Sequence, residues 1–135
     1  MPRRKASHYR VAVDRDATCV ANGAFPTAFG REWTPEHLVL AALARCVLAS
    51  LAYHARRDGL ALAASADADG TVFQRPDGRW GFVEVACRIH AELDPAPGGD
   101  ELRALLARAE RGCFVGASLD PRPAYGWRVN GADVA

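Results

Sequence analysis

The sequence has no uninterrupted apolar stretch long enough to suggest a membrane span. Its longest apolar run, from Leu38 to Ala44, stops at Arg45, whereas a transmembrane helix needs about 20 predominantly apolar residues. The basic N-terminus leads directly into residues 7–10 (Ser-His-Tyr-Arg) and lacks the apolar core of a secretory signal. We therefore expect a protein of the reducing cytoplasm that does not associate with membranes.

An excess of charge of one sign is also lacking. The chain carries 17 Lys and Arg residues against 16 Asp and Glu residues, a net charge of +1, so we expect no nucleic-acid partner. The short basic run at residues 2–5 predicts a solvated, disordered tail over residues 1–6. Since 50% of its 135 residues are hydrophobic and no repeat interrupts it, the chain is expected to form one domain over residues 1–135.

The four cysteines include no Cys-x-x-Cys pair, so we expect no structural zinc ion. We also expect no other cofactor, because the thiol chemistry considered below needs neither a metal nor a flavin. In a cytoplasmic chain of this length, cysteines are core residues, metal ligands or reactive thiols. Cys87 falls on the apolar side of an alternating segment and Cys19 beside a short strand, so both are expected to pack in the core. Cys46 and Cys113 are the candidates for chemistry, and Cys113 follows a glycine at a predicted helix end.

Alternation of apolar and polar residues predicts the strands. They are expected over residues 9–13, 18–22, 60–74, 83–93 and 124–130. Turns are predicted at Asp14 to Asp16 and at Arg75 to Gly78, where turn-forming residues gather. The segment 23–33, which contains Gly, Pro and Thr, is expected to be a loop.

Two helices are expected. The first begins at Pro35 behind the N-cap Thr34 and ends in a charged turn at residues 56–59. Its apolar residues lie nearly all the way round, which is typical of a helix buried on most sides. The second helix is expected to begin at the cap residue Asp100 and to end at residues 111–112.

These elements predict an α+β fold. A helix that is apolar on all faces is hard to cover in a chain of 135 residues, because two thin sheets and one short second helix offer little surface. We therefore expect an obligate homodimer in which this helix packs against its counterpart in the second subunit. Sedimentation that shows a stable folded monomer at micromolar concentration would contradict this expectation.

Other polar and aromatic residues have structural interpretations. Ser50 lies one helical turn from Cys46 and is expected to hydrogen-bond a helix carbonyl. His54 is expected to be a near-core residue with its hydrogen bonds satisfied. Packing roles are expected for the three tryptophans, Trp33, Trp80 and Trp127.

Two segments resemble the signatures of the OsmC/Ohr family. Residues 34–38 (Thr-Pro-Glu-His-Leu) and 41–46 (Ala-Ala-Leu-Ala-Arg-Cys) are similar to the family's Pro-Glu helix start and to its peroxidatic cysteine, ten residues after the Glu. Residues 109–119 are similar to the segment around the second cysteine, with Phe114 and Gly116 where Pro and Ser are usual. The resemblance implies two antiparallel sheets around a central buried helix, in an intertwined homodimer with active sites at the subunit interface.

The resemblance also implies roles for individual residues. Cys46 corresponds to the peroxidatic cysteine and Cys113 to the second thiol. The family's activating arginine lies in the turn after the first strand, which corresponds to Arg15, with Arg31 as the alternative. Glu36 would orient this guanidinium. Because ten residues of helix place Glu36 about 15 Å from Cys46, it would act from the partner subunit.

The function implied is that of a thiol-dependent peroxidase. Cys46 would attack an organic hydroperoxide and become a sulfenic acid, and Cys113 would condense with it to a disulfide. A lipoyl-type dithiol or a small thiol would reduce that bridge by exchange. The apolar residues Leu43, Phe114 and Trp33 would favour alkyl hydroperoxides over hydrogen peroxide. The alternatives are an OsmC-like protein without peroxidase activity, which binds a small hydrophobic or thiol ligand at the dimer interface, and a non-catalytic interaction domain.

Overall fold

The computed structural model describes residues 5–21, 24 and 26–134, and it divides into two compact units over residues 1–36 and 37–135. The tail expected over residues 1–6 falls mostly outside the described residues. Lys5 and Ala6, which are described, are exposed and belong to no helix or strand. The prediction of one domain over the whole chain stays a prediction.

The first unit contains a three-stranded antiparallel sheet in the order β1–β2–β3. Its strands are β1 (Val11–Val13), β2 (Thr18–Ala21) and β3 (Thr27–Ala28). The predicted strand pair is confirmed, although β1 begins two residues late and the expected end of β2 at residue 22 lies outside the described residues. The prediction of a loop over residues 23–33 is wrong at β3, because a two-residue strand is too short to show alternation.

The turn between β1 and β2 forms as predicted. The Asp14 carboxylate accepts hydrogen bonds from the backbone N–H groups of Asp16 and Thr18, at 2.9 and 3.0 Å, as aspartate does in tight turns. Ala17 completes the turn with a left-handed φ of 60°. Arg15 lies in this turn with its side chain exposed.

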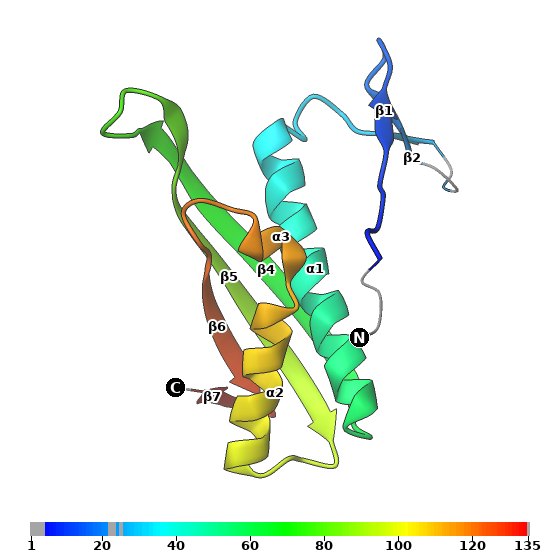
Figure 1. The fold of residues 1–135 in the computed structure, drawn as a ribbon, viewed down its shortest axis with the longest axis vertical. Coiled ribbons are helices and arrows are strands. Elements are labelled where there is room, and N and C mark those ends of the chain that lie inside the picture. Colours follow the sequence, from blue (N-terminus) through cyan, green and yellow to red (C-terminus); the bar gives the residue numbers. More distant parts are fainter. Residues whose placement is uncertain (1–4, 22–23, 25, 135) are drawn as a thin grey trace. The chain divides into compact units, whose positions relative to one another are not determined.

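The second unit is built on a four-stranded sheet in the order β4–β5–β6–β7. The strands are β4 (Ala61–Gln74), β5 (Trp80–Asp94), β6 (Ala124–Val129) and β7 (Ala132–Val134). The long hairpin and β6 were expected, whereas the short β7 was not. The expectation of purely antiparallel sheets is wrong for one pair, since β5 and β6 run parallel. The segment between these strands contains a helix, the usual crossover between parallel neighbours, and Figure 1 shows this helix over the sheet.

The helix α1 (Pro35–Arg57) has the bounds that its caps predict. One stripe along it is buried at helical spacing, formed by Leu43, Val47, Ser50, Leu51 and Ala55. Most of its other apolar residues are only half-buried, and Tyr53 is 52% exposed. The second unit therefore covers one face of this helix and leaves the opposite face partly open.

Two further helices follow the hairpin, α2 (Gly99–Arg111) and α3 (Phe114–Ala117). The N-cap of α2 is Gly98 and not Asp100, which corrects the prediction. The Glu101 carboxylate accepts a hydrogen bond from the Gly98 N–H at 2.9 Å, so the backbone is capped without Asp100, which pairs with Arg103 instead. The four-residue α3 was not expected, because one helical turn has no periodicity to detect.

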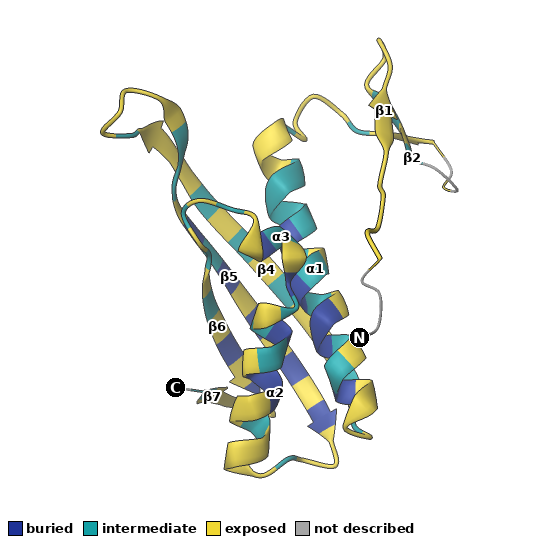
Figure 2. Cartoon of the chain, in the orientation of Figure 1, coloured by how far each residue is buried: buried dark blue, intermediate teal, exposed yellow. Residues whose placement is uncertain are grey.

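The core lies between the four-stranded sheet and the helices α1 and α2 (Figure 2). β5 alternates buried and exposed residues along its second half, as a strand with one covered face does. An ion pair of 2.7 Å between Asp58 and Arg108 joins the end of α1 to α2. The largest fully buried side chains are Leu43, Leu51, Ile89, Leu105, Val47, Cys87 and Cys113.

By length and composition alone, α1 could cross a membrane, since it contains an 18-residue window with a mean hydropathy of 1.7. The expectation that no stretch is long and apolar enough is therefore wrong, because the single charge of Arg45 does not lower this average sufficiently. Leu43, Val47 and Leu51 are fully buried in the core that α1 shares with the sheet. A core helix of a globular fold passes the same test.

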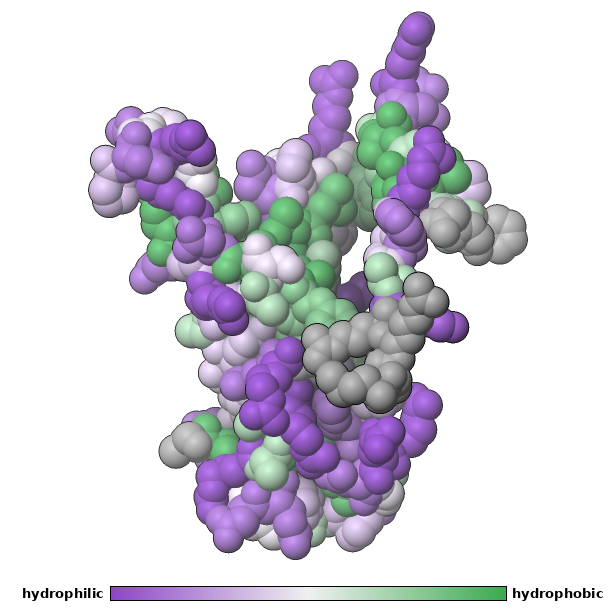
Figure 3. Space-filling view, viewed as in Figure 1, coloured by the Kyte–Doolittle hydropathy of each residue, from purple (hydrophilic) through white to green (hydrophobic). Residues whose placement is uncertain are grey.

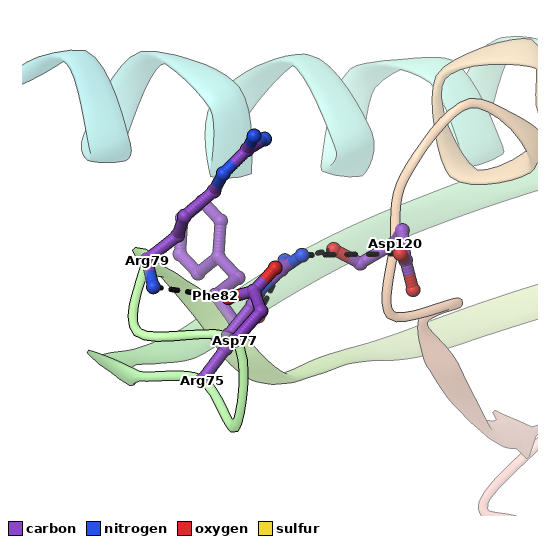
Figure 4. A network of polar contacts seen from close by, with 5 residues as sticks. All are labelled: Arg75, Asp77, Arg79, Phe82 and Asp120. Atoms are coloured by element: carbon purple, nitrogen blue, oxygen red, sulfur yellow. Dashed lines mark hydrogen bonds and ion pairs between the residues drawn. The ribbon is translucent and has the colours of Figure 1, made fainter.

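Arg75 joins the tip of the β4–β5 hairpin to the segment that follows α3 (Figure 4). Its guanidinium donates to the Phe82 carbonyl at 2.8 and 3.2 Å and to the Asp120 carbonyl. It also lies 3.8 Å from the Asp120 carboxylate. These contacts hold the connection between α3 and β6 against the hairpin. Trp80, in the same hairpin, is 66% exposed and packs edge-on against Phe73. Its packing role is therefore a contact between two side chains at the surface of the protein.

Candidate functional site

The structure brings Cys46 and Cys113 together. The Cys46 sulfur accepts a hydrogen bond of 3.5 Å from the backbone N–H of Val115, which is two residues after Cys113. After burial, the neighbouring Cys46 also raises the pKa of Cys113. A cysteine from the middle of α1 thus meets a cysteine that lies 67 residues later in the sequence.

The local backbone explains this meeting. α2 ends at Gly112, and Cys113 is the N-cap of α3, with its carbonyl accepting a hydrogen bond from the Ala117 N–H at 3.0 Å. The change from one helix to the next turns the Cys113 side chain into the core, where it is fully buried. Cys46 is half-buried on α1 and is therefore the thiol that a ligand from solvent can reach.

Burial is the largest influence on Cys113 and raises the pKa of its thiol. The Tyr125 hydroxyl and the Gly116 N–H lower this pKa by hydrogen bonding, and Cys46 raises it. The net effect keeps the Cys113 thiol protonated at neutral pH. Cys113 is thus suited to react second, with a partner already activated, and not to make the first attack.

Cys87 is a third thiol beside this pair. It is fully buried on β5, which confirms its predicted core position, and its Cα is paired with that of Tyr125 on β6. Burial first, and then the charges of Cys113 and Asp67, raise the pKa of Cys87 to about 11. Such a thiol is unreactive at neutral pH. Cys19 lies half-buried on β2 in the first unit.

A pocket of about 520 Å³ opens beside Cys46. It is lined by Cys46, Ala49, Ser50, Tyr53, His54, Gly112 and Phe114. Its lining contains no lysine or arginine, and the rim residue Phe114 is 76% exposed. Figure 3 shows hydrophobic side chains gathered on the face where α1 and α3 lie. The pocket therefore suits the apolar part of a small ligand.

Four side chains contribute polar atoms to this lining: Cys46, Tyr53, Ser50 and His54. The Ser50 hydroxyl is buried and makes no hydrogen bond to any residue that the structure describes. The expectation that it bonds a helix carbonyl is therefore wrong. His54 is half-buried, as expected, and packs edge-on against Tyr53 with ring centroids 5.0 Å apart.

The other predicted site residues belong to the first unit. Arg15 is exposed in the β1–β2 turn, Arg31 is exposed after β3, and Glu36 is exposed in the first turn of α1. Cys46 belongs to the second unit. The assignments of Arg15 as the activating guanidinium and of Glu36 as its partner stay predictions.

Sequence reasoning missed two residues that contact the thiols. A Cβ on Gly116 would lie 2.0 Å from the Tyr125 hydroxyl and 3.2 Å from the Cys113 sulfur, so both groups pack against this glycine. No motif marks Tyr125, because only the parallel pairing of β5 with β6 brings it to Cys87 and Cys113. The family pattern marks Gly116 as a departure from the usual serine, but it does not reveal that Tyr125 and Cys113 pack against this glycine.

Trp127 confirms its predicted packing role, since it is buried and donates a hydrogen bond of 3.0 Å to the Glu110 carboxylate. Trp33 is 48% exposed, and its ring centroid lies 5.8 Å from that of Phe29. Within the described part of the chain, no three His, Cys, Asp or Glu side chains are grouped so that they could hold a metal ion. The chemistry that this site offers comes from its thiols.

Solved structures share this fold at low sequence identity. An OsmC-like protein of unknown function from Vibrio cholerae has a TM-score of 0.78 and 15% identity, over 91% of this chain and 100% of that chain. An organic hydroperoxide resistance protein OsmC from Legionella pneumophila has a TM-score of 0.57 and 18% identity, over 95% and 98%. An organic hydroperoxide resistance protein from Elizabethkingia anophelis, with thiocyanate bound, has a TM-score of 0.58 and 17% identity, over 96% and 98%.

Comparison with curated proteins gives no match. The family model described as OsmC-like protein matches residues 28–126, which include both central thiols and most of the chain. The predicted α+β class, with two sheets and a long helix, is confirmed by the structure and by its likeness to OsmC-like folds. The chain therefore belongs to the OsmC-like protein family.

Proposed function

We propose that this protein is a thiol-dependent peroxidase that reduces organic hydroperoxides with Cys46 and Cys113. The observation that carries the proposal is the hydrogen bond from the Val115 N–H to the Cys46 sulfur, which holds the half-buried thiol against the segment of the buried one. Other support comes from the apolar pocket beside Cys46. Family membership adds to it, because some proteins of this fold are named for organic hydroperoxide resistance.

The proposed cycle is balanced at each step. The Cys46 thiolate attacks the terminal oxygen of ROOH, the O–O bond breaks, and the products are Cys46 sulfenic acid and an alkoxide that takes a proton to become ROH. The Cys113 thiol then attacks the sulfenic sulfur, which forms the disulfide and releases water. A dithiol of the lipoyl type, or a small thiol, returns both cysteines to the reduced state by exchange and is itself oxidised.

Counting free thiols tests this proposal. Reduced protein mixed with a small molar excess of tert-butyl hydroperoxide is expected to lose two of its four thiols, much faster than free cysteine is oxidised. Dithiothreitol is expected to restore both, since the product is a disulfide. Loss of thiols no faster than in free cysteine would contradict the proposal.

A guanidinium is proposed to activate Cys46, and the pocket lining supplies none. Arg15, in the β1–β2 turn, is the proposed source, with Arg31 as the alternative. An Arg15→Ala variant is expected to slow oxidation by tert-butyl hydroperoxide at pH 7 by about 10- to 100-fold, because a thiol without a nearby cation is mostly protonated at this pH. The rate of the matched Arg31→Ala variant decides between the two residues, and unchanged rates in both would contradict an activating role for either.

We propose a homodimer for this protein, with an organic hydroperoxide and a dithiol as its other partners. The partly open apolar face of α1 and the exposed Phe114 at the pocket rim support a second subunit there. Glu36 fits the same proposal. Ten residues of helix keep it about 15 Å from Cys46 of its own chain, so it would act on the thiol of the second subunit. The need for a dithiol reductant agrees with a cytoplasmic location, which we also propose.

A second candidate function is the binding of a small hydrophobic or thiol ligand without peroxidase turnover. The pocket supports it, because its lining is mainly apolar and contains no cation to activate Cys46. In that case the thiols would survive the hydroperoxide. A thiol-bearing ligand supplied as its symmetric disulfide would still form a mixed disulfide with Cys46 by exchange and release one equivalent of ligand thiol. The thiol count separates the two functions directly.

A further inference from the structure

The hydroxyl of Ser50 is a buried polar group without a partner. Ser50 is 8% exposed, and its oxygen makes no hydrogen bond within the described part of the chain. A serine inside a helix normally bonds the carbonyl four residues earlier or turns out to solvent, and this one does neither. A buried hydroxyl without a hydrogen bond destabilises the folded protein. The hydroxyl is therefore free to donate a hydrogen bond to a bound ligand.

The position of Ser50 indicates what this ligand is. Ser50 follows Cys46 by one helical turn, and both line the pocket of about 520 Å³. Residues four apart on a helix have Cβ atoms about 5–6 Å apart on the same face, a span that a peroxide group lying between sulfur and hydroxyl can bridge. The neighbouring pocket residues Ala49, Tyr53 and Phe114 offer apolar surface for an alkyl group.

The backbone at Gly112 keeps this hydroxyl close to the pocket wall. A Cβ at Gly112 would lie 2.5 Å from the Ser50 oxygen and 3.4 Å from Nε2 of His54, so a side chain at residue 112 would displace the hydroxyl from this position. The hydroxyl faces Gly112, so contact with a ligand in the pocket takes a change of the Ser50 side-chain rotamer. Ser50 and His54 therefore lie near one another at Gly112, about one and two helical turns beyond the thiol.

We propose that the Ser50 hydroxyl binds the carbon-bound oxygen of the hydroperoxide and stabilises the alkoxide that leaves. This inference rests on the proposed peroxidase function and adds a catalytic residue and a substrate orientation to it. Cys46 attacks the terminal oxygen, the electrons of the O–O bond pass to the carbon-bound oxygen, and Ser50 donates a hydrogen bond to the charge that develops there. The alkoxide then takes a proton from water and leaves as the alcohol. The substrate class is alkyl hydroperoxides, with the alkyl group directed to Tyr53 and Phe114.

The Ser50→Ala variant tests this role, with Ser65→Ala on the exposed part of β4 as the matched control. We expect the rate of Cys46 oxidation by tert-butyl hydroperoxide to fall at least about 10-fold in Ser50→Ala, because a hydrogen-bond donor to developing charge is lost. Alkylation of Cys46 by iodoacetamide should keep its rate, since iodide leaves without needing this donor. The melting temperature should rise, because an unpaired buried hydroxyl is removed. The control should match the wild type in all three measurements.

Each other outcome has a definite meaning. An unchanged oxidation rate in Ser50→Ala would overturn the proposal, and so would a parallel fall in oxidation, alkylation and melting temperature, which would assign Ser50 a structural role. If the wild type itself is not oxidised faster than free cysteine, the peroxidase function fails. The Ser50 contact is then tested by binding of the alcohol 2-phenyl-2-propanol, which is measured from the amide chemical shifts of Gly112 and Val115. Weaker binding by Ser50→Ala would support the contact, and equal binding would overturn it.

Discussion

Replacement of Cys46 by serine is expected to abolish the fast reaction with organic hydroperoxides. In the Cys46→Ser variant the remaining thiols of the second unit, Cys87 and Cys113, are both fully buried, and burial raises the pKa of each. Neither offers an accessible thiolate at neutral pH. The measurement is the loss of free thiols after addition of tert-butyl hydroperoxide, which should fall to the rate of free cysteine. Cys19→Ser, a half-buried cysteine outside the pair, is the matched control and should keep the wild-type rate.

The second thiol should give a different result. A Cys113→Ser variant keeps Cys46, so its first encounter with hydroperoxide should be as fast as in the wild type. Without Cys113 the sulfenic acid has no thiol to condense with, and excess hydroperoxide carries it to sulfinic and sulfonic acid, which dithiothreitol does not reverse. Intact mass should show two or three added oxygen atoms. A reversible disulfide in this variant would mean that Cys87 or Cys19 takes the place of Cys113.

The long elements were predictable because each carries a local signal. Thr34 and Pro35 mark the start of α1, and the alternation along β5 marks a strand with one buried face. The shorter elements β3, β7 and α3 have two to four residues, which is too few for either period to appear. The parallel pairing of β5 with β6 is a property of the crossover through α2, and no single strand encodes it.

The cap of α2 illustrates a different limit. Asp100 is the better cap residue by type, yet the structure uses Gly98, because the Glu101 carboxylate satisfies the Gly98 N–H from within the helix. Either residue would give an acceptable start, and the local hydrogen bond from Gly98 to Glu101 accounts for the one observed. An error of two residues at a helix end is of the usual size.

The thiol pair was predictable from motifs, whereas its surroundings were not. The spacing around Cys46 and Cys113 identified both residues, but not the Val115 N–H that contacts the Cys46 sulfur. General helix chemistry predicts a hydrogen bond from Ser50 to a helix carbonyl, whereas its hydroxyl has no partner among the described residues. Contacts of this kind depend on where α2 ends against α1, which sequence periodicity does not determine.

Gly116→Ala is expected to disturb the second thiol more than any other single added methyl group. The new Cβ would lie 2.0 Å from the Tyr125 hydroxyl and 3.2 Å from the Cys113 sulfur, and the first distance is far inside van der Waals contact. The hydroxyl ends a rigid ring on β6, so α3 or the ring must shift. Overpacking of this kind costs about 1–3 kcal/mol, against a gain of up to about 1 kcal/mol for alanine over glycine in a helix. The variant should therefore be less stable in urea denaturation.

The same shift should act on the chemistry. Because the Tyr125 hydroxyl and the Gly116 N–H both lower the pKa of Cys113, displacing them should leave a weaker second nucleophile and slow disulfide formation, while the first oxidation of Cys46 stays fast. Stopped-flow measurement of the two steps separates these effects. Gly126→Ala is the control, since its Cβ would meet only the Cγ of Arg88 at 3.7 Å, an ordinary contact. Equal rates of disulfide formation in Gly116→Ala and Gly126→Ala would show that the packing around Tyr125 does not govern the reactivity of Cys113.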